Sequence, residues 1–453
     1  MNWSTLLSSK RQNQKTATEG ISRSSFEQDF DRIIFSHPFR KLQDKTQVHP
    51  LPEHDFVHTR LTHSLEVSSV GRSLGKRAGE VIMERHPELE KNFSSFDFGA
   101  ITAAAALAHD MGNPPFGHAG EAALSEYFKN KTFDITKAEY EDLINFEGNA
   151  QGFRILNKKQ FGLRLTYATL GAFTKYPCPS LLPGRDKKKK SQKKFGYFQS
   201  EADAFKDVAE NLGLIQTSNG VPKNPGQAPK NPGQAPKTPG QAWCRHPVAF
   251  LVEAADDICY SVIDLEDGCR MGLVSFNDTL DLLAPILGSK LNKEKLSTTP
   301  GLNEKLGVLR AMAIGELIEA SNEVFLANEE SILNGSFDHA LTDLCKFKDA
   351  LGVINKVSIE KIYRTHTVVE IEASGHEVLP GLLHEFVTAG TELVNPNASK
   401  KNKNLALLFP EEVRLAITDA DTYTILRNVI DFISGLTDRH ALSLYRKIKG
   451  ISF

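Results

Sequence analysis

Histidine and carboxylate residues lie close together in one short stretch, LAHDMGNPPFGHAGE, which covers residues 107–121. His109 is followed directly by Asp110, and the rigid turn sequence Gly-Asn-Pro-Pro-Phe-Gly separates this pair from His118. Glu121 comes three residues after His118, so the two side chains would share one face of a helix that begins near His118. Imidazole and carboxylate groups bind divalent cations and transfer protons, so this stretch indicates metal-assisted or general acid–base chemistry.

Further candidate ligands lie far away in the chain. His63 is near the start of a predicted helix, and the pair His109–Asp110 ends a helix whose alanines permit close packing against its neighbours. In VEAADDICYSVIDLED, Asp256, Tyr260 and Asp264 recur every four residues and therefore line one helix face. A divalent cation that serves phosphate chemistry needs such ligands converging from rigid elements, with open positions for water and substrate.

The helix that carries Asp256 is expected to lie in the core. Its apolar stripe consists of Leu251, Ala255, Ile258, Val262 and Leu265. Asp257 points about 100° away from the acidic face, because successive residues of a helix are rotated by that angle. Since buried carboxylates require cations, we expect positive charge or a metal ion opposite the acidic face.

Helical periodicity dominates the elements that must position these residues. Apolar residues three and four positions apart predict helices over 60–82, 97–110, 118–128, 246–267 and 423–448. The fold class is therefore mostly α, with minor β elements. Residues 365–373, THTVVEIEA, are the clearest β-like stretch and predict either a short strand or the end of a helix.

Composition excludes several classes of protein. With 453 residues, 40% of them hydrophobic and 24% charged, the chain has ordinary globular values. No apolar run is long enough to cross a bilayer, and the N-terminus lacks the pattern of an export signal. Five cysteines without a C-x-x-C pair fit neither a disulfide framework nor a zinc knuckle, so we expect a cytoplasmic protein. A net charge of −2 argues against a surface built wholly for nucleic acid.

Two segments have a biased composition. Residues 222–242 form a threefold repeat, PKNPGQA PKNPGQA PKTPGQA, which predicts a flexible surface insertion because it offers no large apolar side chain to bury. Residues 185–194 hold seven basic residues. This basic run predicts either a solvated loop or a contact with a polyanion whose identity the charges alone do not give.

The motifs together resemble a known family. The order H…HD…D is the signature of the HD metal-dependent phosphohydrolases. Several segments are similar in sequence to the bacterial deoxyguanosinetriphosphate triphosphohydrolase family. They are HTRLTHSLEVSSVGRSLG, LAHDMGNPPFGHAGE, NFEGNAQGFRIL, TKYP, KKFGYF and RHPVAFLVEAADDICYSVIDLEDG. The resemblance extends from about residue 29 to about residue 440, and only the Pro-Gly-Gln repeat lies outside it. It implies an HD-domain helical core with additional helices.

The resemblance assigns roles to the residues of the first motifs. It implies that the metal ligands are His63, His109, Asp110 and Asp256, in agreement with the spacing argument. It implies that His118 and Glu121 are the catalytic pair, in which Glu121 orients His118 for proton transfer. Asn113 is a departure, because some HD nucleotide hydrolases have a histidine there and asparagine cannot take up a proton at neutral pH.

Substrate-binding residues are also implied by the resemblance. Those near the deoxynucleoside and its first phosphate are Gln47, Val48, Arg60, Tyr260 and Asp264. Tyr260 would lie against the sugar, Asp264 and Gln47 would bind the 3′-hydroxyl, and Arg60 would bind phosphate oxygens. Val48 is equally compatible with simple core packing. Those that clamp the triphosphate are Lys175, Tyr176 and Lys194, and Asn149 lies in a family motif that faces the site.

The expected reaction is hydrolysis of a dNTP, with dGTP favoured, to a deoxynucleoside and triphosphate by attack of water on the α-phosphorus. Mg²⁺ or Mn²⁺ is the expected ion, and Fe²⁺, Co²⁺ or Ni²⁺ would also suit the ligand set. The resemblance further implies a homo-oligomer, commonly a hexamer, no membrane partner, and single-stranded DNA or a second dNTP as a candidate effector. Two alternatives stay open: another HD phosphodiesterase or nucleotidase, and a non-catalytic nucleic-acid-binding HD protein.

The same patterns divide the chain into segments. The predicted segments are an N-terminal part (1–28), the first part of the HD core (29–221), the repeat insertion (222–242), the last ligand helix (243–280) and a C-terminal helical region (281–453).

Overall fold

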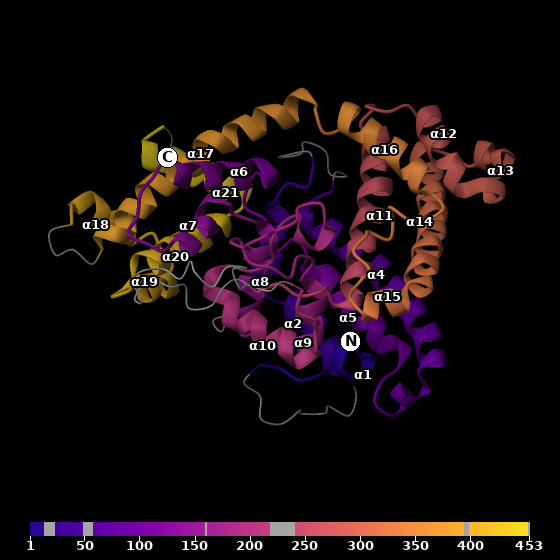
Figure 1. The fold of residues 1–453 in the computed structure, drawn as a ribbon. Coiled ribbons are helices and arrows are strands. Elements are labelled where there is room, and N and C mark those ends of the chain that lie inside the picture. Colours follow the sequence, from indigo (N-terminus) through magenta and orange to yellow (C-terminus); the bar gives the residue numbers. More distant parts are fainter. Residues whose placement is uncertain (13–22, 49–57, 159–160, 218–240, 394–397, 452–453) are drawn as a thin grey trace.

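Helices make up almost all of the regular structure. The computed structural model describes residues 1–12, 23–48, 58–158, 161–217, 241–393 and 398–451 (Figure 1). This confirms the predicted mostly α fold. The repeat at 222–242 lies outside the described residues except for its last two positions. Among the described residues the β structure consists of isolated bridges, which join Arg11 to Thr166, Thr46 to Thr59, Pro179 to Tyr197, and Gln216 to Trp243.

The helices fall into two stretches on either side of the repeat. The first stretch contains α1 (Trp3–Leu6), α2 (Ser25–Ile34), α3 (His37–Arg40), α4 (Arg60–Arg85), α5 (Ser95–Ala108), α6 (Gly117–Lys129), α7 (Lys137–Ile144), α8 (Gly148–Asn157), α9 (Tyr167–Phe173) and α10 (Ala202–Leu212), with 3-10 helices at Lys41–Asp44, Pro87–Lys91, Lys190–Gln192 and Gln199–Glu201. The second contains α11 (Pro247–Arg270), α12 (Phe276–Leu287), α13 (Lys293–Thr298), α14 (Leu302–Ala327), α15 (Glu329–Leu333), α16 (Lys348–Lys361), α17 (His366–Glu392), α18 (Lys400–Ala406), α19 (Glu411–Ile417), α20 (Thr422–Ser434) and α21 (Asp438–Lys449), with a 3-10 helix at Gly288–Lys290.

Glycines let α4 and α5 pack closely in opposite directions. Gly71 faces Ala106, Gly75 faces Thr102, and Gly79 faces Phe98. A Cβ at Gly75 would lie 2.6 Å from the carbonyl oxygen of Phe98, so no larger residue fits without movement. Because the residue numbers rise along one helix as they fall along the other, the start of α4 lies beside the end of α5. This arrangement brings His63 near His109.

The helix α11 crosses the middle of the main core, as its apolar pattern predicts. The stripe Leu251, Ala255, Ile258, Val262 and Leu265 is at most 1% exposed. This helix packs against α4, α5, α9, α14 and α16. Since it is surrounded, its polar face can be directed only at a cavity or at buried partners.

The helix α17 connects two parts of the molecule. It runs along the top of Figure 1, from the neighbourhood of α12 and α16 to that of α18 and the C-terminus. Its residues 366–373 are helical, so the stretch that resembles a strand belongs to the start of this helix. Its second half packs with α6, α20 and α21 in a second apolar cluster, which includes Leu379, Leu383 and Phe386.

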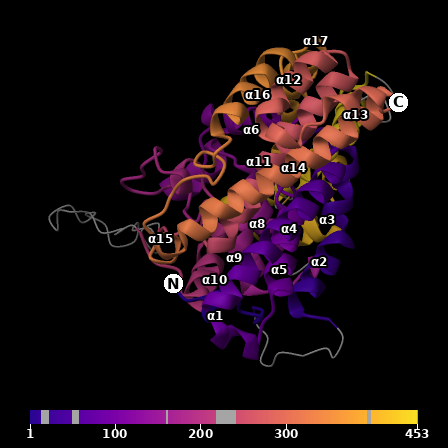
Figure 2. The same cartoon turned by 90° about the vertical axis from the view of Figure 1, so that its right-hand side faces the viewer.

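The view in Figure 2 shows α14 crossing the molecule beside α11.

No helix in the described ranges combines the length and the apolar content that a bilayer span requires.

Residues 423–448, which have one continuous helical period, are divided into α20 and α21 by a turn at Gly435–Thr437. The Thr437 side chain accepts the N–H of His440 and caps α21. The turn places Asp438 at the first position of the new helix, buried against the part of the molecule that contains α4 and α6.

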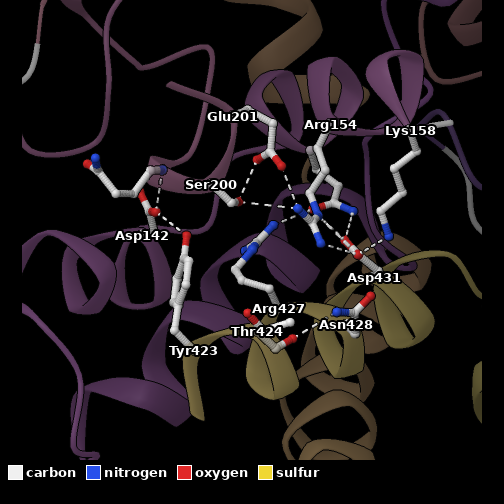
Figure 3. Close-up of polar contacts among 12 residues, drawn as sticks. Asp142, Arg154, Lys158, Ser200, Glu201, Tyr423, Thr424, Arg427, Asn428 and Asp431 are labelled. Carbon is white, nitrogen blue, oxygen red and sulfur yellow. Dashed lines mark hydrogen bonds and ion pairs between the residues drawn. The ribbon is translucent and has the colours of Figure 1, made fainter. Parts of the chain in front are cut away.

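A buried ionic network joins α8 to α20 (Figure 3). Arg154 Nη2 lies 2.8 Å from Asp431 Oδ2, and Arg154 Nη1 lies 2.5 Å from Glu201 Oε1. Lys158 also pairs with Asp431. Arg427 donates a hydrogen bond to Gln151 and lies over the ring of Phe198. The C-terminal helices are therefore fixed to the helix that begins next to Asn149.

Candidate active site

The start of one helix, the end of a second and one face of a third bring together three of the proposed metal ligands. His63 lies in the first turn of α4, His109 directly follows α5, and Asp256 lies on α11. Asp256 Oδ1 is 3.2 Å from His63 Nε2 and 3.6 Å from His109 Nε2. One ligand atom from each residue lies within 4.8 Å of the others, and no other such group of three occurs in the described ranges. The group could hold a divalent metal ion.

Asp110 lies at the edge of this group and has two further partners. Its Oδ1 is 3.5 Å from His109 Nε2 and accepts a hydrogen bond of 2.5 Å from the amide of Asn113, while its Oδ2 accepts one of 2.7 Å from Arg60. Burial would raise the pKa of Asp110, but Arg60, His109 and His63 lower it to about 2. Asp110 is therefore ionised at neutral pH, which suits a metal ligand.

His118 and Glu121 lie side by side at the start of α6, as their spacing predicts. His118 Nδ1 is 3.1 Å from Glu121 Oε2. The His118 side chain is 87% exposed, whereas Glu121 is held underneath, where its Oε1 accepts the N–H of Gly148 at 2.7 Å. Burial would raise the pKa of Glu121, but His118 and Lys194 lower it, so the carboxylate stays charged and can orient the imidazole.

A cavity of about 480 Å³ connects these groups. Its lining includes most of the residues that the sequence analysis proposed: Gln47, Val48, Arg60, His63, His109, Asp110, His118, Asn149, Lys175, Tyr176, Lys194, Asp256 and Tyr260. Two proposed residues do not line it. Glu121 lies behind His118, and Asp264 lies behind Tyr363, whose hydroxyl donates to Asp264 Oδ2 at 2.8 Å.

Ion pairs hold both lysines of the cavity. Lys175 Nζ lies 3.3 Å from Glu253 Oε1, and the other oxygen of Glu253 accepts a hydrogen bond of 2.7 Å from Arg245. Lys194 Nζ lies 3.1 Å from Glu147 Oε1 and 3.8 Å from Glu121 Oε2. Burial would lower the pKa of each lysine, but the carboxylates raise it, so both stay cationic. The cavity is therefore lined by two cationic side chains, each of which is paired with carboxylates.

Comparison with known proteins agrees with this geometry. Residues 60–148 match the HD domain model, and residues 346–447 match the model of the phosphohydrolase-associated domain. A deoxyguanosinetriphosphate triphosphohydrolase-like protein of Synechocystis sp. is 42% identical over the whole length of both chains. The chain belongs to the deoxyguanosinetriphosphate triphosphohydrolase-like family of HD-domain hydrolases.

Other relatives extend the match. A protein of the same description from Pseudomonas aeruginosa is 37% identical over all of this chain and 99% of its own length. A deoxyguanosinetriphosphate triphosphohydrolase of Salmonella enteritidis is 29% identical over 94% of both chains. The family resemblance implied by the motifs is thereby confirmed.

The site of this family member is not confined to its HD domain region. The HD match contains His63, His109, Asp110 and the pair His118–Glu121. Asp256 lies between the two matched regions, and Tyr363 lies in the phosphohydrolase-associated region. Tyr260, which also lies between the matched regions, stacks with Tyr363 with the ring centres 5.2 Å apart, so this intervening segment and the phosphohydrolase-associated region form one wall together.

Several cavity residues escaped the sequence analysis. Glu253 lies three residues before Asp256 on α11, so helical spacing could have revealed it. Tyr363 lies in the turn between α16 and α17, and Val368 and Glu372 lie at the start of α17, about a hundred residues further along the chain. No local pattern connects these three residues with the metal-ligand motif, because only the packing of α17 brings them to the cavity.

Proposed function

We propose that this protein hydrolyses a deoxynucleoside triphosphate to a deoxynucleoside and inorganic triphosphate, with dGTP as the favoured substrate. One observation carries the proposal: a single cavity is lined by the His63–His109–Asp256 group, by His118, by the cationic Lys175 and Lys194, and by Tyr260 and Tyr363. These groups offer partners for each part of a nucleotide, with the metal-ligand group for the scissile α-phosphate, the lysines for the triphosphate and the tyrosines for the sugar. The naming of the relatives points to the same substrate.

A divalent ion fits the residues present. Two imidazoles and two ionised carboxylates, with Asp110 as the fourth member, form a set suited to Mg²⁺ or Mn²⁺, and also to Fe²⁺, Co²⁺ or Ni²⁺. When bound, such an ion polarises a phosphate and lowers the pKa of water. The position of His118 at the cavity edge suits transfer of a proton, and Glu121 keeps the imidazole oriented.

Arg60 and Gln47 line the cavity and suit a nucleotide as ligand. Arg60 would donate to a phosphate oxygen and Gln47 would bind a hydroxyl group of the nucleoside.

Elsewhere in the cavity lining, Lys175, Tyr176 and Lys194 would neutralise and position the triphosphate that leaves. Tyr260 would lie against the sugar, and Val48 would close the cavity beside it. Asp264 would act through the hydroxyl of Tyr363 or reach the 3′-hydroxyl if that tyrosine moves. Asn149 would bind the phosphates from the start of α8.

Product analysis tests the proposal. The protein is incubated with each dNTP in the presence of Mn²⁺, Mg²⁺ or a chelator, and the products are separated by ion-exchange chromatography. Metal-dependent release of deoxynucleoside and intact triphosphate is expected, with dGTP turned over fastest. Release of orthophosphate or pyrophosphate would instead indicate another HD phosphodiesterase or nucleotidase.

We further propose that the active species is a homo-oligomer and that a second dNTP or single-stranded DNA acts as effector. Light scattering gives the oligomeric state, and repeating the assay with dNTP mixtures and with single-stranded DNA tests activation. Absence of turnover under all these conditions would favour a non-catalytic binding protein.

A further inference from the structure

A second cavity, of about 760 Å³, lies beside the first. The two cavities share the side chains of His118 and Lys194, which therefore stand at the boundary between them. These are the residues to which we assigned the proton transfer and the triphosphate. An anion released at His118 and Lys194 would thus be in contact with both cavities.

Basic side chains of one loop, Arg185, Lys187 and Lys193, line part of the second cavity and are here called its basic wall. They belong to the basic run at 185–194, and Lys129 at the end of α6 adds a further cation to the lining. Neither Lys187 nor Lys193 makes an ion pair within the described ranges. The other lysines of the run are placed differently, since Lys188 and Lys189 do not line the cavity and Lys190 pairs with Asp343 at 2.7 Å.

The loop that carries this basic wall is fixed by its own contacts. Arg185 Nε donates to the carbonyl of Gln192 at 2.8 Å, and the amide oxygen of Gln192 accepts the N–H of Asp186 at 2.9 Å. Ser191 donates from its N–H and its hydroxyl to Asp338, at 2.9 and 3.0 Å. The basic side chains thus project from an ordered loop and not from a freely moving one.

Four carboxylates also line the cavity. Glu121 and Glu147 pair with Lys194, Glu126 lies 3.9 Å from His376, and Glu141 accepts a hydrogen bond of 2.9 Å from the neutral amide of Asn145. The carboxylates lie on or next to α6 and α7, whereas three of the cations lie on the loop. This separation leaves Lys187 and Lys193 without an anionic partner at the cavity.

We propose that the second cavity binds the inorganic triphosphate after cleavage, so that this product leaves past Lys194 along the basic wall. The ligand class is a linear inorganic polyphosphate. The inference rests on the proposed function, because that reaction is what supplies triphosphate at Lys194. It gives the basic run a specific polyanion, namely the enzyme's own product.

Direct binding tests this site without turnover. Inorganic triphosphate is titrated into the full-length protein by calorimetry, with chelator present because divalent ions bind triphosphate. We compare wild type with the double variant Lys187→Ala/Lys193→Ala and with a matched control, Lys188→Ala/Lys189→Ala, which removes the same charge from the same run. Loss of two charge-assisted contacts should raise the dissociation constant of the first variant about tenfold or more. The control should bind like wild type within about twofold, because its lysines do not line the second cavity.

Kinetics give a second readout. In the dNTP assay, the inhibition constant of added triphosphate should rise in Lys187→Ala/Lys193→Ala, while KM and the single-turnover rate stay at the wild-type values. The site is overturned if both double variants weaken triphosphate binding equally, since that result indicates a general charge effect, or if neither does. It is also overturned if the first variant loses affinity for a single-stranded oligonucleotide but not for triphosphate. The proposed function is judged separately, by the products that the wild-type protein releases.

Discussion

The carboxylate of Asp438 accepts the backbone N–H of Phe116 at 3.0 Å, although the two residues lie 322 positions apart. Its other oxygen accepts the N–H of Thr46 at 2.9 Å. Phe116 has a φ of 62° and directly precedes α6, whose second residue is His118, while Thr46 precedes Gln47 in the cavity wall. One buried side chain of the C-terminal region therefore positions two walls of the candidate active site.

Removing this carboxylate should impair activity while leaving the chain folded. In Asp438→Ala the strained turn at Phe116 loses its partner, so we expect kcat to fall roughly tenfold to a hundredfold through misplacement of His118. Hydrogen exchange measured at the amides of Thr46 and Phe116 should accelerate in the variant. Asp421→Ala is the control, because Asp421 also accepts a backbone N–H, from Thr424 at 2.7 Å, but caps α20 at the surface. Unchanged exchange at both amides would contradict the positioning role.

Single substitutions should distinguish the proposed proton-transfer residue His118 from the proposed metal ligand Asp256. His118→Ala should lower kcat by about 10²-fold to 10⁴-fold, the range expected for a general acid or base, and keep the metal content of wild type. Asp256→Ala should lose both turnover and metal, because it removes the oxygen that His63 and His109 share. Metal analysis of the purified variants, together with the dNTP assay, checks both statements. A near-normal rate in His118→Ala would show that another group transfers the proton.

Close packing of α4 on α5 should be sensitive to a single methyl group. In Gly75→Ala the added Cβ would meet Thr102 and the carbonyl of Phe98, so unfolding free energy should fall by about 1–3 kcal/mol. Gly307→Ala is the matched control, since its Cβ on α14 would meet nothing within 4 Å. Because alanine favours the helix, this control should gain up to about 1 kcal/mol. Urea unfolding curves give the unfolding free energy of each variant. Equal changes in the two variants would show that helix propensity, and not packing, determines the change in stability.

The ionic network between α8 and α20 should make stability depend on pH (Figure 3). Burial would raise the pKa of Asp431, but Arg154 and Lys158 lower it below the ordinary value of 3.8. A lowered folded-state pKa means that the unfolded chain takes up the proton first. The stabilisation is therefore complete at pH values above the unfolded-state pKa and declines as pH falls below it.

Asp431→Asn tests this dependence. Loss of the charge should cost about 3–5 kcal/mol at neutral pH, because Arg154 and Lys158 are left buried without a full counter-charge. The difference from wild type should shrink as pH falls below about 4, the ordinary pKa of an unfolded aspartate. Unfolding measured at several pH values gives both the loss of stability at neutral pH and its decrease in acid. A difference that is constant from neutral to acid pH would assign the loss to packing alone.

Much of the candidate site could be predicted from the sequence because its motifs are local. The spacing of His118 and Glu121, the end of a helix at His109, and the shared face of Asp256 and Tyr260 all follow from the 3.6-residue helical repeat. Residues 365–373 were ambiguous between strand and helix because β-branched residues are frequent in strands. The structure resolves the ambiguity, since residues 366–373 form the first turns of the long helix α17 and only Val368 among them is buried.

The helices and the groups that they carry follow from the local sequence, since hydrogen bonding within a helix and the direction of its side chains depend on neighbours in the chain. Long-range packing is what puts Tyr363 between Asp264 and the cavity, Asp438 against Phe116, and Lys187 and Lys193 at a second cavity. These relationships join residues that are far apart in the chain or on separate elements. They depend on which surfaces pack together, and that choice is made by the whole core and not by any local pattern.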